Sequence, residues 1–129
     1  MRSSLVGSFV LIVSSAACAG CTESPTFPGD PRVCTAVAVQ SLNVTVLDAA
    51  SGQRVCDATV VASEGAFQET LRSFGPEADC VYAGPTERAG VYEVRVSKAG
   101  YQPASVSNVR VGEDECHVIP VKLTISLSR

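Results

Sequence analysis

The chain has 129 residues, of which 46% are hydrophobic and 5% aromatic, with 7 prolines, 10 glycines, 6 cysteines and no tryptophan. This length allows one small domain with a modest core, and the composition is typical of exported β-rich domains rather than cytosolic enzymes. The formal net charge of −3 and the absence of any basic run exclude nucleic acid as an expected partner.

The first 20 residues have the three parts of an export signal. Arg2 supplies a thin positive n-region, residues 5–13 form an apolar h-region, and residues 14–20 form a c-region of small residues. Because the apolar stretch is too short to span a bilayer, a cleaved signal is expected rather than a transmembrane anchor.

Two cleavage sites compete at the end of this signal. Residues 17–19 (Ala-Cys-Ala) fit a small-x-small site, whereas residues 18–21 (Cys-Ala-Gly-Cys) resemble the bacterial lipobox, whose last cysteine is lipidated and becomes the mature N-terminus. Cys18 departs from that pattern, since an aliphatic residue usually stands there. Cleavage before Cys21 leaves an even set of cysteines for an oxidising compartment, namely Cys34, Cys56, Cys80 and Cys116.

The same spacing, Cys18-x-x-Cys21, is found in thioredoxin-like redox pairs, but those require the first cysteine at a helix N-terminus. Here the pair lies between a signal core and a proline-rich stretch, so we expect a lipid on Cys21 instead. Thr22 follows, rather than an aspartate retention signal, which predicts residence at the outer membrane. Residues 21–33 then form a lipid-anchored, proline-rich tether that spaces the domain from the membrane.

From Cys34 to the C-terminus the hydrophobic period is two, which predicts β-strands. Residues 41–55 and 56–65 are expected to form a hairpin about the turn at Asp48–Gly52, with their apolar faces made by Leu42, Val44, Val46, Ala58, Val60 and Ala62. Residues 89–101 predict a strand that buries Tyr92, Val94 and Val96.

Two further strands are expected in residues 104–111 and 116–127, separated by an acidic turn. Pro120 cannot donate to a ladder, so the last strand should lie at a sheet edge near its start, or the N–H side of this position should point to solvent. Its inward residues are expected to be Ile119, Val121, Leu123, Ile125 and Leu127. Residues 66–84 fit both the helical spacing and the alternation of a strand, and we predict a strand there. About seven strands with regular turns indicate an all-β, single antiparallel β-sandwich in residues 34–129.

The order of "VTVLDAASGQRVCDATV", "AGVYEVRVSKAGYQ" and "VRVGEDECHVIPVKLTISL" resembles the carboxypeptidase regulatory-like domain, a transthyretin-like (prealbumin-like) sandwich. The matching motifs are structural: Gly52, Gly90 and Gly100 in turns, Tyr92 and Tyr101, and the alternating valines. The resemblance implies an Ig-like fold and a companion or surface module, and it carries over no catalytic residue.

Four mature cysteines allow three pairings, and the sequence alone does not choose among them. In Ig-like sandwiches the first strand can lie parallel to the last, which would bring Cys34 close to Cys116. Cys56 and Cys80 would then form the second disulfide.

Candidate chemistry is sparse. His117 is the single histidine, and its neighbour Cys116 should point to the opposite face of a strand, so a Cys-His dyad is not expected. The acidic run at residues 113–115 matches no calcium loop and is expected to be a solvated turn. Tyr82, Tyr92 and Tyr101 could offer a sugar platform, but the last two are expected to pack in the core or at a corner, with their hydroxyls bonded to backbone.

Glu87 and Arg88 should form an exposed charged pair of small energetic value. We expect no catalytic residue, no metal ligand and no cofactor. The predicted function is that of a non-enzymatic, membrane-anchored lipoprotein that acts as an interaction or structural module of the cell envelope, with an envelope protein as possible partner. The alternative is a small-ligand or glycan-binding module of the cell surface.

Overall fold

A computed structural model describes residues 33–129; the predicted signal peptide, the lipid on Cys21 and the tether up to residue 32 lie outside the described residues. The described residues form strands and no helix, and hence no helix long and apolar enough to cross a membrane. In chain order the strands are β1 (Gln40–Asp48), β2 (Thr59–Glu64), β3 (Phe67–Thr70), β4 (Arg72–Phe74), β5 (Val81–Thr86), β6 (Gly90–Ser97), β7 (Ala104–Val111) and β8 (Val121–Leu127).

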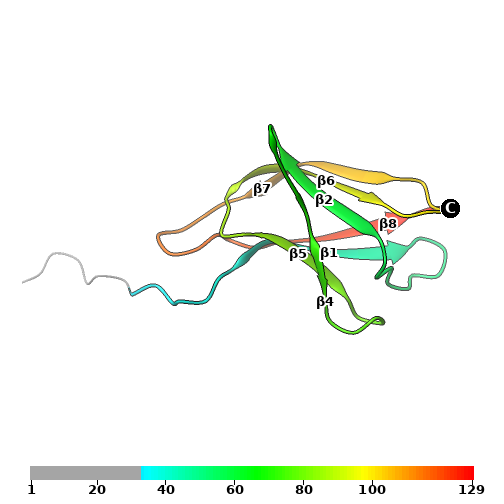
Figure 1. Cartoon of the computed structure of the whole chain (residues 1–129), viewed down its shortest axis with the longest axis horizontal. Coiled ribbons are helices and arrows are strands. Elements are labelled where there is room, and N and C mark those ends of the chain that lie inside the picture. Colours follow the sequence, from blue (N-terminus) through cyan, green and yellow to red (C-terminus); the bar gives the residue numbers. More distant parts are fainter. Residues whose placement is uncertain (1–32) are drawn as a thin grey trace, which may run out of the picture. The chain divides into compact units, whose positions relative to one another are not determined.

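These strands form two four-stranded sheets, in the orders β4-β5-β1-β8 and β3-β2-β6-β7 (Figure 1). Neighbouring strands are antiparallel except for β1 and β8, which run parallel from the pair Leu42 and Val121 to the pair Asp48 and Leu127. The prediction of an all-β sandwich is therefore confirmed, as is the parallel pairing of the first strand with the last.

The core lies between the two sheets and follows the alternation of the sequence. Side chains at every second position of β1, β2 and β6 are buried: Leu42, Val44, Val46, Val60, Ala62, Tyr92, Val94 and Val96. Complete burial of a valine or leucine side chain stabilises a fold by about 1.5–3 kcal/mol. The strands that were predicted most clearly therefore supply the largest part of the core.

The predicted hairpin between the first two strands is wrong. The turn forms where expected, because Gly52 has a φ of 70° and Leu47 makes an isolated bridge to Arg54. The chain then crosses to the other sheet, where β2 pairs with β3 and β6. Both edges of β1 are already occupied by β5 and β8, so β2 has no position beside it.

The single strand expected in residues 66–84 is three strands in two sheets. Phe67–Thr70 pairs with β2, whereas Arg72–Phe74 pairs with β5 in the opposite sheet. Leu71 lies between them and is 5% exposed, so its side chain fills the core at the point where the chain changes sheets. The strand count is therefore eight rather than about seven.

The last strand lies at the edge of its sheet, as predicted, but Pro120 is not part of it and does not cause that position. It begins at Val121, so Ile119 and Pro120 precede it. The prediction that Ile119 faces inward is wrong, because its side chain is 55% exposed and its N–H donates to the carbonyl of Gly112 across a turn. Ile125 and Leu127 are buried as expected, and Val121 and Leu123 are half-buried.

Candidate functional site

Two disulfides, Cys34–Cys116 and Cys56–Cys80, join the four cysteines of the described residues, with Cα–Cα distances of 5.2 and 5.7 Å. The predicted pairing is confirmed. Cys116 lies in the turn between β7 and β8, however, and does not open the last strand, which begins at Val121. The Cys34–Cys116 bond thus ties residues 33–39, which we name the leading segment, to residues 112–118, the β7–β8 turn.

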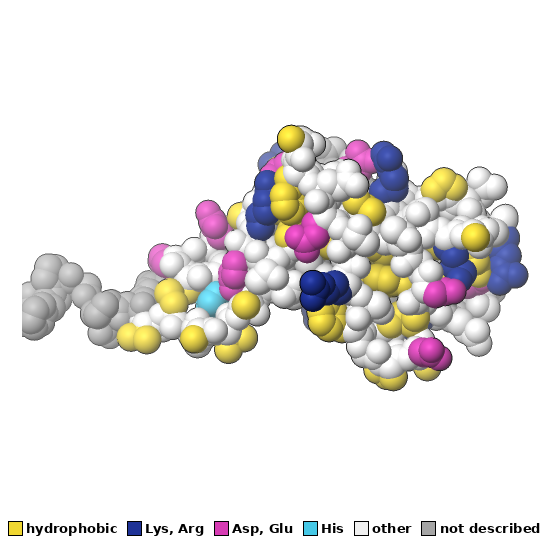
Figure 2. Space-filling view, in the orientation of Figure 1, with side chains coloured by type: hydrophobic (Ala, Val, Ile, Leu, Met, Phe, Trp, Pro, Cys, Tyr) yellow, Lys and Arg dark blue, Asp and Glu magenta, His cyan; other side chains and the backbone are white. Residues whose placement is uncertain are grey.

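An open hollow of about 460 Å³ lies against the Cys34–Cys116 bond, and we name it the disulfide hollow. It is lined by Thr35, Ala36, Val37, Ala38, Glu87, Glu113, Asp114, Glu115, Cys116, His117 and Val118. In Figure 2 the histidine, in cyan, lies among hydrophobic and acidic side chains. No lysine or arginine is among the described residues that line the hollow, so its charged side chains are carboxylates.

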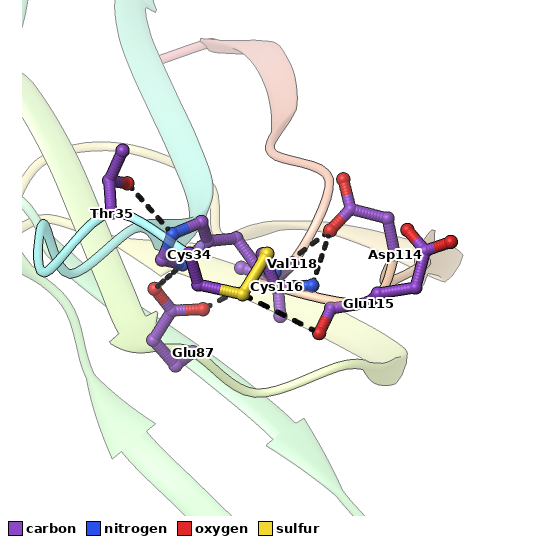
Figure 3. The surroundings of a disulfide bond; sticks show 8 residues. Cys34, Thr35, Glu87, Asp114, Glu115, Cys116 and Val118 are labelled. Atoms are coloured by element: carbon purple, nitrogen blue, oxygen red, sulfur yellow. Dashed lines mark hydrogen bonds and ion pairs between the residues drawn. A yellow bond between two sulfur atoms is a disulfide. The ribbon is translucent and has the colours of Figure 1, made fainter. Parts of the chain in front are cut away.

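A chain of hydrogen bonds runs across this hollow (Figure 3). The Thr35 hydroxyl lies 3.0 Å from Nε2 of His117, and Nδ1 of His117 lies 2.7 Å from Oε1 of Glu87. A neutral imidazole that donates from Nδ1 to the carboxylate leaves Nε2 as the acceptor of the hydroxyl proton. The residues come from the leading segment, the β7–β8 turn and the β5–β6 connection respectively.

The Glu87 carboxylate holds these three segments together. Besides His117, it accepts the N–H of Val39 at 2.7 Å and the N–H of Val118 at 3.2 Å, while the Glu87 N–H donates to the Val39 carbonyl. The Val39 hydrogen bond is the main cause that lowers the pKa of Glu87 below its ordinary value of 4.5, and His117 adds to it. Glu87 has a φ of 47°, in the left-handed region that few residues other than glycine adopt.

The order of hydroxyl, imidazole and carboxylate is the order of a hydrolase triad. Acyl transfer also needs donors that stabilise the negative charge of the transition state. Around Thr35, the charged side chains of the described residues are carboxylates, which oppose that charge. Nor do the described residues hold a group of three or more metal-ligating side chains. The arrangement of Thr35, His117 and Glu87, which we name the polar clamp, joins the leading segment, the β7–β8 turn and the β5–β6 connection.

A second hollow, of about 590 Å³, lies beside the β1–β2 connection and the C-terminus. Its charges are paired: Asp48 accepts the Tyr101 hydroxyl at 2.6 Å and Arg129 at 3.3 Å, and Lys98 pairs with Asp57. Oδ1 of Asp48 also accepts the N–H groups of Ala50 and Ser51, which confirms its predicted role in the turn. The hydrogen bond from Tyr101 is the largest cause that lowers the pKa of Asp48.

The tyrosines form no exposed platform, because Tyr82 and Tyr92 are 2% and 1% exposed. Their hydroxyls donate to the carbonyls of Val55 and Arg88, respectively. The prediction of a backbone bond is confirmed for Tyr92, but Tyr101 bonds to the Asp48 side chain instead.

The expected exposed pair of Glu87 and Arg88 is wrong. The Arg88 guanidinium bonds to Glu64 at 2.9 Å and lies 3.8 Å from the ring centre of Phe67. Arg88 also donates to the Tyr92 hydroxyl at 2.8 Å, whereas Glu87 reaches His117. Adjacent residues thus serve two separate clusters.

Sequence reasoning missed Thr35 and Glu87. Thr35 follows Cys34 as His117 follows Cys116, so the predicted disulfide itself was a signal that Thr35 lies near His117. No local pattern indicates Glu87, which is 30 residues from His117 in the chain. Cys116 is in a disulfide, which removes the thiol of the Cys-His dyad that was considered and rejected.

The described residues do not include Cys21, so the predicted lipid site is untested by this geometry. Comparison of the chain with protein-family models gives no match, and a search of curated protein sequences also gives none. The resemblance to carboxypeptidase regulatory-like domains therefore stays a prediction.

Proposed function

We propose that the mature chain is a non-enzymatic lipoprotein, anchored through Cys21 at the outer membrane, whose sandwich acts as an interaction or structural module of the cell envelope. The resemblance of its sandwich to carboxypeptidase regulatory-like domains belongs to the same proposal. The observation that carries it is the pairing of every cysteine after residue 33 into two disulfides. Such bonds form and persist in oxidising compartments, as a mature lipoprotein of the envelope requires.

The position of the first disulfide supports a tethered domain. Cys34 directly follows the predicted tether of residues 21–33, so the covalent framework starts where the predicted tether ends. The 12 Cα-to-Cα steps from Cys21 to Val33 (33 − 21) span at most about 40 Å when the chain is fully extended. The sandwich would therefore stay near the membrane that holds the lipid.

An interaction role is favoured over ligand binding by the surface of the described residues. The two larger hollows are open and lined by charged side chains, whereas ligand sites are enclosed and mostly apolar. Three of the five large hydrophobic side chains that are exposed lie at the end held by Cys34–Cys116, namely Val33, Val37 and Ile119. Exposed apolar groups gathered in one place are typical of protein-contact surfaces.

Anchoring is tested with the wild-type chain and two matched variants, C21S and C18S. The wild type and C18S should fractionate with the outer membrane and yield an N-terminal peptide that begins at a diacylglycerol-modified Cys21. C21S should lose the modification and the membrane association. A wild-type chain with an unmodified N-terminus in the soluble periplasmic fraction would refute the proposal.

The interaction role is tested by a photo-crosslinking residue at Val37, with the exposed β7 position Ser105 as the matched control. In intact cells, an adduct of defined mass is expected from position 37 and not from position 105. Equal labelling from the two positions, or labelling from neither, would contradict a specific contact surface at this end.

A further inference from the structure

The two disulfides differ in their surroundings. Cys80 belongs to the hydrophobic core and is 1% exposed, and Sγ of Cys56 lies 2.6 Å from the carbonyl oxygen of Glu77. Cys34 is exposed, Cys116 is half-buried at the disulfide hollow, and Sγ of Cys34 lies 3.9 Å from the carbonyl oxygen of Glu115. A thiol can therefore approach Cys34–Cys116 more easily than Cys56–Cys80.

We propose that Cys34–Cys116 is a thiol-exchange site, which a dithiol reductant opens while Cys56–Cys80 stays closed and the sandwich stays folded. The reductant's thiolate attacks the exposed sulfur of Cys34, the bond between Cys34 and Cys116 breaks, and Cys116 leaves as a thiolate. The second thiol of the reductant then displaces Cys34. Two electrons and two protons pass from the dithiol to the cysteine pair, and the reductant ends as its own disulfide.

The leaving group decides which disulfide reacts first. Attack on Cys56, the accessible sulfur of the other pair, must expel Cys80 as a thiolate inside the apolar core, where burial disfavours the charged form. Attack on Cys34 expels Cys116, which lines an open hollow and has access to water. The accessibility of the attacked sulfur and the solvation of the leaving thiolate thus both favour reaction at Cys34–Cys116.

Opening this bond leaves the sheets paired. β1 and β8 stay joined along the register from Leu42 and Val121 to their C-terminal ends. The leading segment and the β7–β8 turn still share the bonds of Thr35 with His117 and of Glu87 with Val39 and Val118. After reduction, hydrogen bonds alone hold the leading segment against the β7–β8 turn, and this end of the sandwich can open locally.

In the anchored protein this change would lengthen the tether, a consequence that rests on the proposed function. The six residues from Cys34 to the start of β1 (40 − 34) add up to about 20 Å of reach when they leave the sandwich. The exchange reaction itself does not depend on the lipid, so a failure of one proposal is distinguishable from a failure of the other.

The test uses the oxidised mature protein and dithiothreitol as the dithiol. Samples are quenched with iodoacetamide at set times, the remaining disulfides are reduced and blocked with N-ethylmaleimide, and each cysteine is scored by peptide mapping. Cys34 and Cys116 should become accessible at least tenfold faster than Cys56 and Cys80, while the far-UV circular dichroism stays unchanged. The reverse order, or simultaneous reaction of both pairs as the folded signal is lost, would overturn the proposal.

A C34S/C116S variant serves as the control for folding. Its Cys56–Cys80 bond should react at the slow rate of the same bond in the wild type. A much faster rate would show that loss of the first disulfide opens the whole sandwich, and this would also overturn the proposal.

Discussion

Replacing Cys34 and Cys116 together by alanine is expected to lower the free energy of unfolding by roughly 3–4.5 kcal/mol. The bond closes a loop with a sequence separation of 82, and in the chain-entropy model a loop of that length gives about 4.5 kcal/mol at 25 °C. The lower bound allows for relaxation of the leading segment, which lies outside both sheets and gains freedom in the folded variant. Because a small domain has about 5–15 kcal/mol of stability, the variant should remain folded.

The assay is urea unfolding followed by far-UV circular dichroism, with C56A/C80A as the matched variant. The Cys56–Cys80 separation of 24 corresponds to about 3.5 kcal/mol, so loop length alone separates the two variants by only about 1 kcal/mol. Any larger loss in C56A/C80A reports the packing of Cys80 in the core. A loss below about 1 kcal/mol in C34A/C116A would refute the inference that this bond restrains the unfolded chain.

Three further changes test the polar contacts. In Y82F the Val55 carbonyl and the Ala58 N–H lose the phenol that bonds both at 2.9 Å, so urea unfolding should show a loss of about 1–3 kcal/mol. Glu87 has a lowered pKa, so its contribution is complete above pH 4.5 and is lost as the pH falls through the folded-state value. In E87Q the unfolding free energy should therefore fall less steeply below pH 4.5 than in the wild type. The same pH dependence in E87Q and the wild type would contradict a stabilising role of the Glu87 carboxylate. A fluorophosphonate probe should leave Thr35 unmodified by intact mass, whereas stoichiometric labelling would indicate a hydrolase.

The sequence predicted the buried faces better than the strand partners. Alternation at Leu42, Val44 and Val46 identifies which side of β1 is buried, because successive side chains point to opposite faces. Alternation contains no information about which strand lies alongside, so β2 was placed in a hairpin although it belongs to the other sheet. Leu71 shows the same limit, since a buried side chain within an alternating run can also mark a crossing between sheets.

The disulfide pairing was predicted from cysteine parity together with the parallel pairing of the first and last strands that Ig-like sandwiches allow. The contacts of Thr35, Glu87 and His117 with one another were not predictable, because these residues come from three distant segments. Glu87 also has a φ of 47°, which no short motif of the sequence predicts. Contacts between loops therefore required the structure, whereas contacts between strands could be partly inferred from the pattern.

Mass spectrometry of the mature N-terminus tests most directly the proposal that this sandwich is a lipid-anchored envelope module. The account predicts a chain that begins at Cys21, with a diacylglycerol thioether on its sulfur and with Cys34–Cys116 and Cys56–Cys80 both oxidised. A mature chain that begins at Gly20, or at an unmodified Cys21, and is recovered from the soluble periplasmic fraction would contradict it.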